Sequence, residues 1–108
     1  MSEGPWFVYL LLCESGRIYT GVTPVLDRRI AAHVKGRGAL FTKLNRPAKL
    51  LAAKPFPSHS EALKVEKQVK QARAGDKRVL ADIWVRHHPL PADLDSIVAP
   101  SEAARPAA

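Results

Sequence analysis

The chain has 108 residues, with 17 lysines and arginines against 10 aspartates and glutamates, so its net charge is +7 and its pI is near 10.0. This length suits one domain with a single modest core and excludes two. The charge favours a polyanionic partner, with nucleic acid as the first candidate, but a basic run can also be only a solvated face. The excess is concentrated in residues 28–60, which contain eight lysines and arginines and no acidic residue.

The single cysteine, Cys13, lies in an apolar run, which excludes an intrachain disulfide and favours a buried thiol. The run from Phe7 to Cys13 has no basic segment before it and is too short to span a bilayer. We therefore expect a soluble protein that is not exported, has no membrane contact and works in the reducing cytoplasm.

Two strands are predicted at residues 6–13 and 17–22, where aromatic and aliphatic side chains follow the alternation of a β-hairpin. The first strand is apolar on both faces, as a central strand is. One face of the hairpin is expected to point into the core. Its residues are Val8, Leu10, Leu12, Ile18 and Val22.

The two tyrosines of the chain, Tyr9 and Tyr19, both fall on the other face of this hairpin. If residues 14–16 form the connecting loop, Tyr9 lies opposite Gly21 and Leu11 lies opposite Tyr19. The two phenols are then diagonal neighbours, about 7–8 Å apart at the backbone, which is close enough for long side chains to converge.

A helix is predicted after the hairpin, with Thr23 as its N-cap, Pro24 as its first residue and Gly36 just beyond its end. Arg29 and His33 are four residues apart and therefore point the same way. The apolar stripe of this helix is expected to consist of Leu26, Ile30 and Val34.

The glycine-punctuated, basic segment 36–47 is read as a connection with a short helical turn, followed by a strand at 48–54. Ser58 opens a capping box for a helix over 59–72, and a further helix is predicted over 76–86, with Val79, Leu80, Ile83 and Trp84 as its apolar positions.

The order β-β-α-β-α-α predicts a small α/β domain with an antiparallel hairpin at its centre. Residues 1–88 form the predicted domain. The proline- and alanine-rich residues 89–108 are expected to be a flexible tail.

Glu66 is a carboxylate on the apolar stripe of the predicted helix 59–72, beside Ala62, Val65 and Val69. One interpretation is an ordinary ion pair with Lys70, four residues further along the helix. The other is that a lone carboxylate among cations holds a hard divalent metal, Mg²⁺ or Mn²⁺, with waters and a substrate phosphate completing the coordination.

These residue types suit phosphodiester hydrolysis. Arg29 would neutralise the charge that grows on the phosphorus, the metal at Glu66 would steady the leaving oxygen, and a phenol or His33 would orient and deprotonate the attacking water. Tyr9 is favoured for contact with that water because Gly21 opposite it leaves space for a phosphate, and Tyr19 would support it.

The ordered set Phe7-Val8-Tyr9, Tyr19-Thr20-Gly21, Arg29-x-x-x-His33 and Glu66 resembles the GIY-YIG nuclease domain over about residues 5–85. The resemblance is greatest to the short, stand-alone bacterial type. That type is echoed by Trp6, Gly36-Arg37-Gly38-Ala39, Thr42-Lys43 and Arg46-Pro47.

This resemblance implies a three-stranded antiparallel sheet flanked by helices and a single-metal endonuclease site. It implies that Tyr9 and Tyr19 are the motif tyrosines, Arg29 the catalytic arginine, His33 its helix companion and Glu66 the metal ligand. The sequence departs from the family pattern at Phe7 and Val8, at Thr20 and in having no asparagine after Glu66.

The expected substrate is nucleic acid, with DNA favoured over RNA and structured or damaged DNA in repair or recombination as a possible target; a separate protein could supply specificity. Two other hypotheses stay open: a non-catalytic nucleic-acid-binding module, and an interaction domain whose charge is incidental. The residues expected to contact the phosphate backbone are Arg28, Lys35, Arg37, Lys43 and Arg46.

Overall fold

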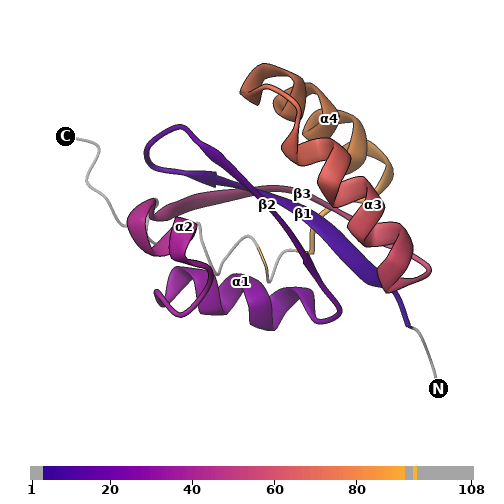
Figure 1. The fold of residues 1–108 in the computed structure, drawn as a ribbon, viewed down its shortest axis with the longest axis horizontal. Coiled ribbons are helices and arrows are strands. Elements are labelled where there is room, and N and C mark those ends of the chain that lie inside the picture. Colours follow the sequence, from indigo (N-terminus) through magenta and orange to yellow (C-terminus); the bar gives the residue numbers. More distant parts are fainter. Residues whose placement is uncertain (1–3, 92–93, 95–108) are drawn as a thin grey trace.

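The computed structural model describes residues 4–91 and residue 94 (Figure 1). Its elements are β1 (Trp6–Cys13), β2 (Ile18–Thr23), α1 (Leu26–Val34), α2 (Leu40–Leu44), β3 (Pro47–Phe56), α3 (His59–Lys70) and α4 (Ala74–His87). The strands form one antiparallel sheet in the order β2-β1-β3, so β1 is central, as its two apolar faces predict. The predicted α/β class and element order are confirmed, with α2 as the short helical turn.

The hairpin has the predicted register. Tyr9 pairs with Gly21 and Leu11 with Tyr19, and Gly16 in the connecting loop has a φ of +90°. The loop closes through two backbone hydrogen bonds between Cys13 and residues 16 and 17. The side chains of β1 and β2 are therefore distributed between the two faces of the sheet as the sequence predicts.

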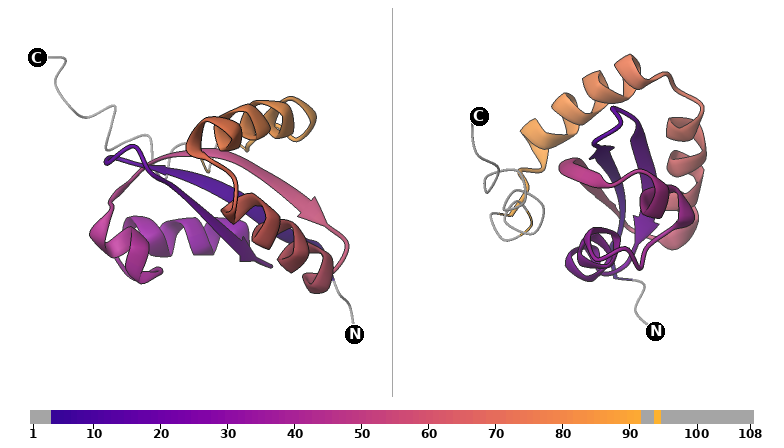
Figure 2. Two further views of the ribbon diagram at one scale, coloured as in Figure 1. Left: turned by 45° about the horizontal axis from the view of Figure 1, so that its top comes forward. Right: turned by 90° about the vertical axis from the view of Figure 1, so that its left-hand side faces the viewer.

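The sheet is the middle layer of three. Figures 1 and 2 show α1 and α2 on one face and α3 and α4 on the other. On the α3 and α4 side, buried Val8, Leu10 and Ile18 pack against Ala62 and Trp84. The other face carries its own buried cluster, which includes Tyr9, Leu11, Leu26, Ile30 and Leu50. The two helical layers thus rest on opposite sides of the same central strand.

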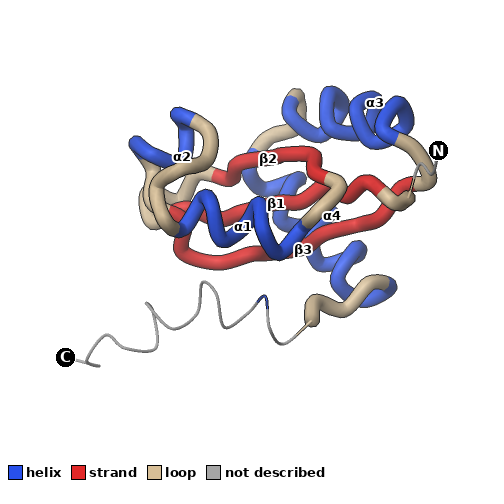
Figure 3. The backbone as a smooth tube through the Cα atoms, turned by 90° about the horizontal axis from the view of Figure 1, so that it is seen from below, coloured by secondary structure: helices blue, strands red, loops and turns tan. Residues whose placement is uncertain are grey.

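Each helical layer has a distinct position on the sheet. In Figure 3, which views the sheet from below, α1 lies in front of the strands and α4 behind them, while α3 runs beside β2. The α3 helix contacts β1 and β2, whereas α4 packs mainly on β3. Residues on α3 are consequently the ones that approach the tyrosine-bearing hairpin from the second face.

The first helix begins later than predicted. Thr23 is the last residue of β2, where it pairs with Phe7, and α1 begins at Leu26 with Val25 as its N-cap. The Thr23 hydroxyl accepts a hydrogen bond from the Val25 N–H at 3.1 Å, so it caps a turn instead of the helix. The helix ends as predicted, with Gly36 at a φ of +77°.

The predicted stripe of α1 is wrong at its last position. Val34 is 37% exposed, and His33 takes its place among the buried residues of the helix. The polar ring can be buried because it has a hydrogen-bond partner on each nitrogen, described below.

The end of β3 and the apolar face of α4 also differ from the prediction. The strand β3 continues through Pro55, which pairs with Phe7. A proline is tolerated there because β3 is an edge strand with one side free of ladder hydrogen bonds. In α4, the predicted apolar positions Val79 and Ile83 are 58% and 43% exposed, because the helix meets the sheet through Ala81 and through Trp84, which was predicted correctly.

The segment after α4 returns toward the α1 side of the sheet. Leu94 is buried with the α1 cluster, and Leu90 packs against that cluster. The remainder of the predicted tail lies outside the described residues, so the domain boundary at residue 88 stays a prediction. None of the described helices is long and apolar enough to cross a membrane.

Candidate functional site

The two phenols converge on the α1 face of the sheet. The ring centroids of Tyr9 and Tyr19 are 6.1 Å apart, and Tyr9 is fully buried while Tyr19 is half-buried. The space above Gly21 is filled by the Tyr9 phenol, which a Cβ on Gly21 would strike, so the predicted open space for a phosphate is wrong. Glycine is needed at position 21 for the tyrosine itself.

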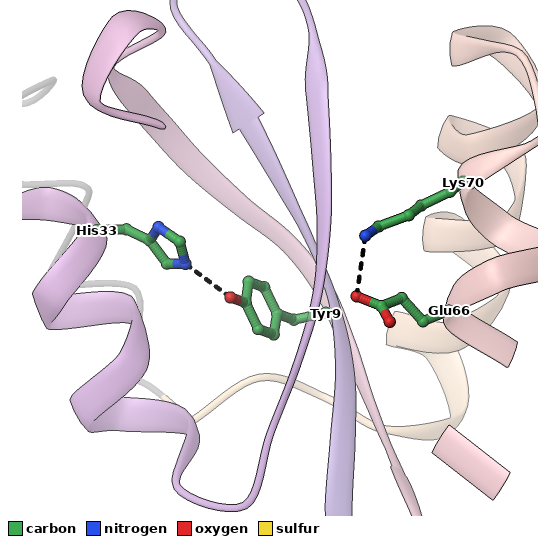
Figure 4. A network of polar contacts seen from close by, with 4 residues as sticks. All are labelled: Tyr9, His33, Glu66 and Lys70. Atoms are coloured by element: carbon green, nitrogen blue, oxygen red, sulfur yellow. Dashed lines mark hydrogen bonds and ion pairs between the residues drawn. The ribbon is translucent and has the colours of Figure 1, made fainter. Parts of the chain in front are cut away.

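His33 joins this pair through a buried chain of hydrogen bonds. The Tyr9 oxygen is 2.6 Å from His33 Nε2, and His33 Nδ1 is 2.7 Å from Thr42 Oγ1 (Figure 4 shows the first of these). The Thr42 hydroxyl donates its one proton to the Ala39 carbonyl at 3.0 Å. Its oxygen must then accept from His33 Nδ1–H, which leaves Nε2 to accept the proton of the Tyr9 hydroxyl.

Thr42 and Gly38 are site residues to which the sequence reasoning assigned no role. Both lie on the segment that leads from α1 into α2, and Thr42 is only 2% exposed. A Cβ on Gly38 would lie 2.8 Å from two carbons of the His33 ring, so the backbone of Gly38 forms a wall of the histidine site. The Gly-x-Gly pattern followed by threonine was the available signal.

Burial sets the protonation state of the network. The pKa of His33 is lowered to about 4, first by burial and then by the positive charge of Arg29. The pKa of Tyr9 is raised, mainly by burial and also by Tyr19, although hydrogen bonding to Arg29 opposes part of this shift. Near pH 7 both groups are therefore neutral, in agreement with the donor and acceptor roles above.

Arg29 is a half-buried member of the same cluster. Burial on its own lowers the pKa of this guanidinium, but hydrogen bonds and charge interactions with Tyr9 and Tyr19 outweigh burial and raise it. From its position on α1, Arg29 thus interacts with both phenols. The structure brings together four of the five predicted catalytic residues: Tyr9, Tyr19, Arg29 and His33.

Glu66 is placed apart from that cluster. Its side chain is 17% exposed, and Oε2 is 3.2 Å from Nζ of Lys70, the ordinary pair that the sequence allowed. Figure 4 shows Glu66 and Lys70 across the strands from His33 and the Tyr9 ring. Its charge still acts on Tyr9, as the smallest of the causes that shift the pKa of that phenol.

The donor set limits the kind of metal site that the chain can form. No group of three or more histidine, cysteine, aspartate or glutamate side chains that could hold a metal occurs within residues 4–91. A closed protein cage is therefore absent from this part of the chain. A single carboxylate at Glu66 fits an ion such as Mg²⁺, which keeps several waters and takes further oxygens from substrate phosphate.

The five residues expected to contact nucleic acid are all exposed. Lys35, Lys43 and Arg46 line one hollow, whereas Arg28 and Arg37 are not among its lining residues. The structure therefore separates the five predicted phosphate contacts into three residues that share a hollow and two that do not line it.

Comparison with known proteins gives a family and several relatives. The model of the GIY-YIG catalytic domain matches residues 5–89. A UPF0213 protein of Xanthomonas axonopodis pv. citri is 41% identical over 79% of each chain. A UPF0213 protein of Neisseria meningitidis is 33% identical over 86% of this chain and 99% of the relative. The solution NMR structure of the UPF0213 protein BH0048 from Bacillus halodurans shares 39% identity, with a TM-score of 0.47 over 73% of this chain and 84% of that chain.

Proposed function

Because the chain belongs to the GIY-YIG family of catalytic domains, we propose that it is a metal-dependent endonuclease that hydrolyses phosphodiester bonds in DNA. Family membership implies nuclease activity on DNA in general terms. The metal dependence, the roles of individual residues and the structured or damaged DNA substrates of repair and recombination are parts of the proposal.

The observation that carries the proposal is a half-buried arginine shared by two phenols. Arg29 interacts with Tyr9 and Tyr19 at a point where Tyr19 remains partly open to solvent. A guanidinium fixed in this way can neutralise charge that develops on a phosphorus during hydrolysis, and it needs no reorganisation to do so.

The two tyrosines have different parts in this proposal. Tyr9 is buried and donates its proton to His33, so it positions Arg29 and is itself closed to water. Tyr19 contacts His33, at a ring distance of 5.0 Å, and is half-buried. Tyr19 is therefore the phenol that we assign to the attacking water, in place of Tyr9.

Glu66 is the residue proposed to hold a divalent metal, Mg²⁺ or Mn²⁺. When bound, the metal would supply Lewis acidity and stabilise the leaving oxygen. Lys70 is 53% exposed, so its ion pair with Glu66 contributes at most about 0.5 kcal/mol and is easily exchanged. Glu66 is thus available to an incoming cation.

A second candidate, a non-catalytic DNA-binding module, is favoured by that same ion pair. A carboxylate already satisfied by Lys70 has no need of a metal. Such a module would bind DNA through the basic surface and leave it intact.

Both candidates are tested by incubating supercoiled plasmid, flapped DNA and branched DNA with the protein, with and without Mg²⁺ or Mn²⁺. We expect metal-dependent nicking that Arg29→Ala reduces by about 10²–10³-fold, the usual effect of removing one stabilising donor. Glu66→Gln should abolish the metal response.

Two matched variants serve as controls. Arg28→Ala removes the neighbouring, exposed arginine, and Glu61→Gln removes an exposed carboxylate of the same helix as Glu66. Both should retain nicking to within about tenfold, since Arg28 supplies at most one backbone contact. Binding without cleavage on every substrate would favour the module, and equal loss in Arg28→Ala and Arg29→Ala would refute the role of Arg29.

A further inference from the structure

A basic hollow lies behind His33, on the side of the imidazole that faces Thr42. It has a volume of about 250 Å³ and is formed where the end of α1, the helix α2 and the start of β3 meet. Its cations are Lys35, which directly follows α1, Lys43 of α2, and Arg46, which directly precedes β3. The turn of the chain through α2 therefore brings three cations of one short segment around a single concavity.

The lining of the hollow suits an anion. None of the described residues that line it is acidic, and His33 and Thr42 form part of its wall. The last carbonyls of α1, on Ala31, Ala32 and His33, accept backbone N–H groups from residues 35–37. Three of the last carbonyls of α1 are therefore already occupied by backbone donors.

The size of the hollow and the exposure of its cations restrict the class of ligand that it can bind. A water molecule takes about 30 Å³ of liquid, so the volume admits a phosphate group together with several waters. Lys35, Lys43 and Arg46 are all exposed, which suits contact with a polymer that passes over the surface. Lysine and arginine contacts of this kind position a nucleic acid without reading its sequence.

We propose that this hollow is a subsite for a backbone phosphate of the DNA, separated from the tyrosine and Arg29 cluster by the His33 and Thr42 side chains. The proposal rests on the proposed function and adds the path of the substrate to it. The DNA strand bound at Tyr19 and Arg29 would continue across α2, and its neighbouring phosphate would lie among the three cations. Arg28 and Arg37 lie outside this proposed path of the DNA.

The test measures the affinity for a short DNA duplex as a function of salt concentration, without divalent metal. The triple variant Lys35→Gln, Lys43→Gln, Arg46→Gln is compared with Lys64→Gln, Lys67→Gln, Arg86→Gln, which removes the same charge from exposed positions of α3 and α4. Each phosphate contact contributes about 0.9 to the slope of log K against log salt concentration. We expect the slope to become shallower by about 2–3 in the first variant and by less than 1 in the second.

Equal changes in the two triple variants, no change in the first, or no duplex binding by the unmodified protein would each overturn the subsite. The plasmid assay separates this result from the proposed function. Nicking that persists while the two triples behave alike would refute the subsite alone. A selective change in slope, with no nicking on any substrate, would support the subsite and refute the nuclease. Circular dichroism of both triples confirms that they are folded.

Discussion

The polar side chains on the two faces of the sheet differ in how completely they are hydrogen-bonded. On the α1 side, Tyr9, His33 and Thr42 are buried in a chain of hydrogen bonds of 2.6, 2.7 and 3.0 Å that ends on a backbone carbonyl. On the α3 side, Glu66 holds a single exposed lysine, and the buried hydroxyl of Thr20 has no hydrogen-bond partner among the described residues.

This difference separates preorganised chemistry from chemistry that needs a ligand. The α1 side is complete within the polypeptide, since every donor in the chain from Tyr9 to Ala39 has an acceptor. The α3 side offers one carboxylate, which pairs with Lys70 and is the residue proposed to hold a metal. We infer that mutations on the α1 side alter stability as well as activity, whereas those at Glu66 act mainly on the proposed metal site.

The largest expected effect on stability comes from acid. The pKa of His33 is about 4 in the folded protein and about 6.5 in an unfolded chain, so the unfolded state binds the proton first. The stabilisation is complete above pH 6.5 and is lost as the pH falls from 6.5 to 4, by roughly 3 kcal/mol in total. Urea unfolding from pH 7.5 to 3.5 measures it.

The exposed His87 provides the control for this titration. His33→Gln should flatten the pH dependence of unfolding, and its effect is compared with that of His87→Gln. A dependence that is unaltered in His33→Gln would show that another group is responsible.

A methyl group at Gly38 should destabilise the α1 side by about 1–3 kcal/mol, because it must displace the His33 ring. The thermal midpoint of Gly38→Ala is then several degrees below that of the parent protein. The matched variant is Gly75→Ala, on α4, where a Cβ meets nothing within 4 Å. Gly75→Ala should be neutral or slightly stabilising. A similar fall of the thermal midpoint in both variants would contradict the close packing of Gly38 against the His33 ring.

Thr42→Val should cost about 1–3 kcal/mol, since it leaves the buried His33 Nδ1–H without an acceptor. Thr42→Ser keeps the hydroxyl and should recover most of the loss.

Nitrogen-detected NMR of the histidine ring reports the tautomer directly. We expect the proton on Nδ1 in the parent and in the serine variant. A proton on Nε2 in the parent protein would reverse the polarity of the whole chain.

Thr20→Val should stabilise the α3 side, by about 1 kcal/mol, because it removes a buried hydroxyl that has no partner and keeps the shape. The urea midpoint should rise without a change in slope. Thr23→Val is the comparison, since the Thr23 hydroxyl accepts the Val25 N–H and its loss should destabilise. A lower midpoint in Thr20→Val would mean that this hydroxyl has a partner in solution.

The smallest effect is expected at Lys70. Lys70→Gln removes the cation that competes at Glu66, so half-maximal nicking should need slightly less Mg²⁺, by about twofold or less. Lys67→Gln, an exposed change on the same helix, is the control. A large loss of nicking in Lys70→Gln alone would instead place Lys70 on the substrate.

Much of the fold could be predicted because it is specified locally. The register of the hairpin follows from the three-residue loop and the period of two along Tyr9 and Leu11. Likewise, Ser58 accepts the Glu61 N–H at 3.2 Å, as the capping box predicts. The start of α1 could not be predicted, because Thr23 fits both the end of a strand opposite Phe7 and the N-cap of a helix. Only the structure shows that its hydroxyl caps a turn.

The sequence by itself determined which residue types meet at the tyrosine face, because spacing along a strand and along a helix decides which side chains point together. It also indicated the family, through an ordered set of residues at compatible spacings. Only the tertiary structure decided that His33 is buried and neutral, that Thr42 and Gly38 shape its site, and that Glu66 stands across the sheet. These depend on how α2 folds back onto α1 and how α3 packs on β2, which are contacts between separate elements that the spacing within one strand or helix does not encode.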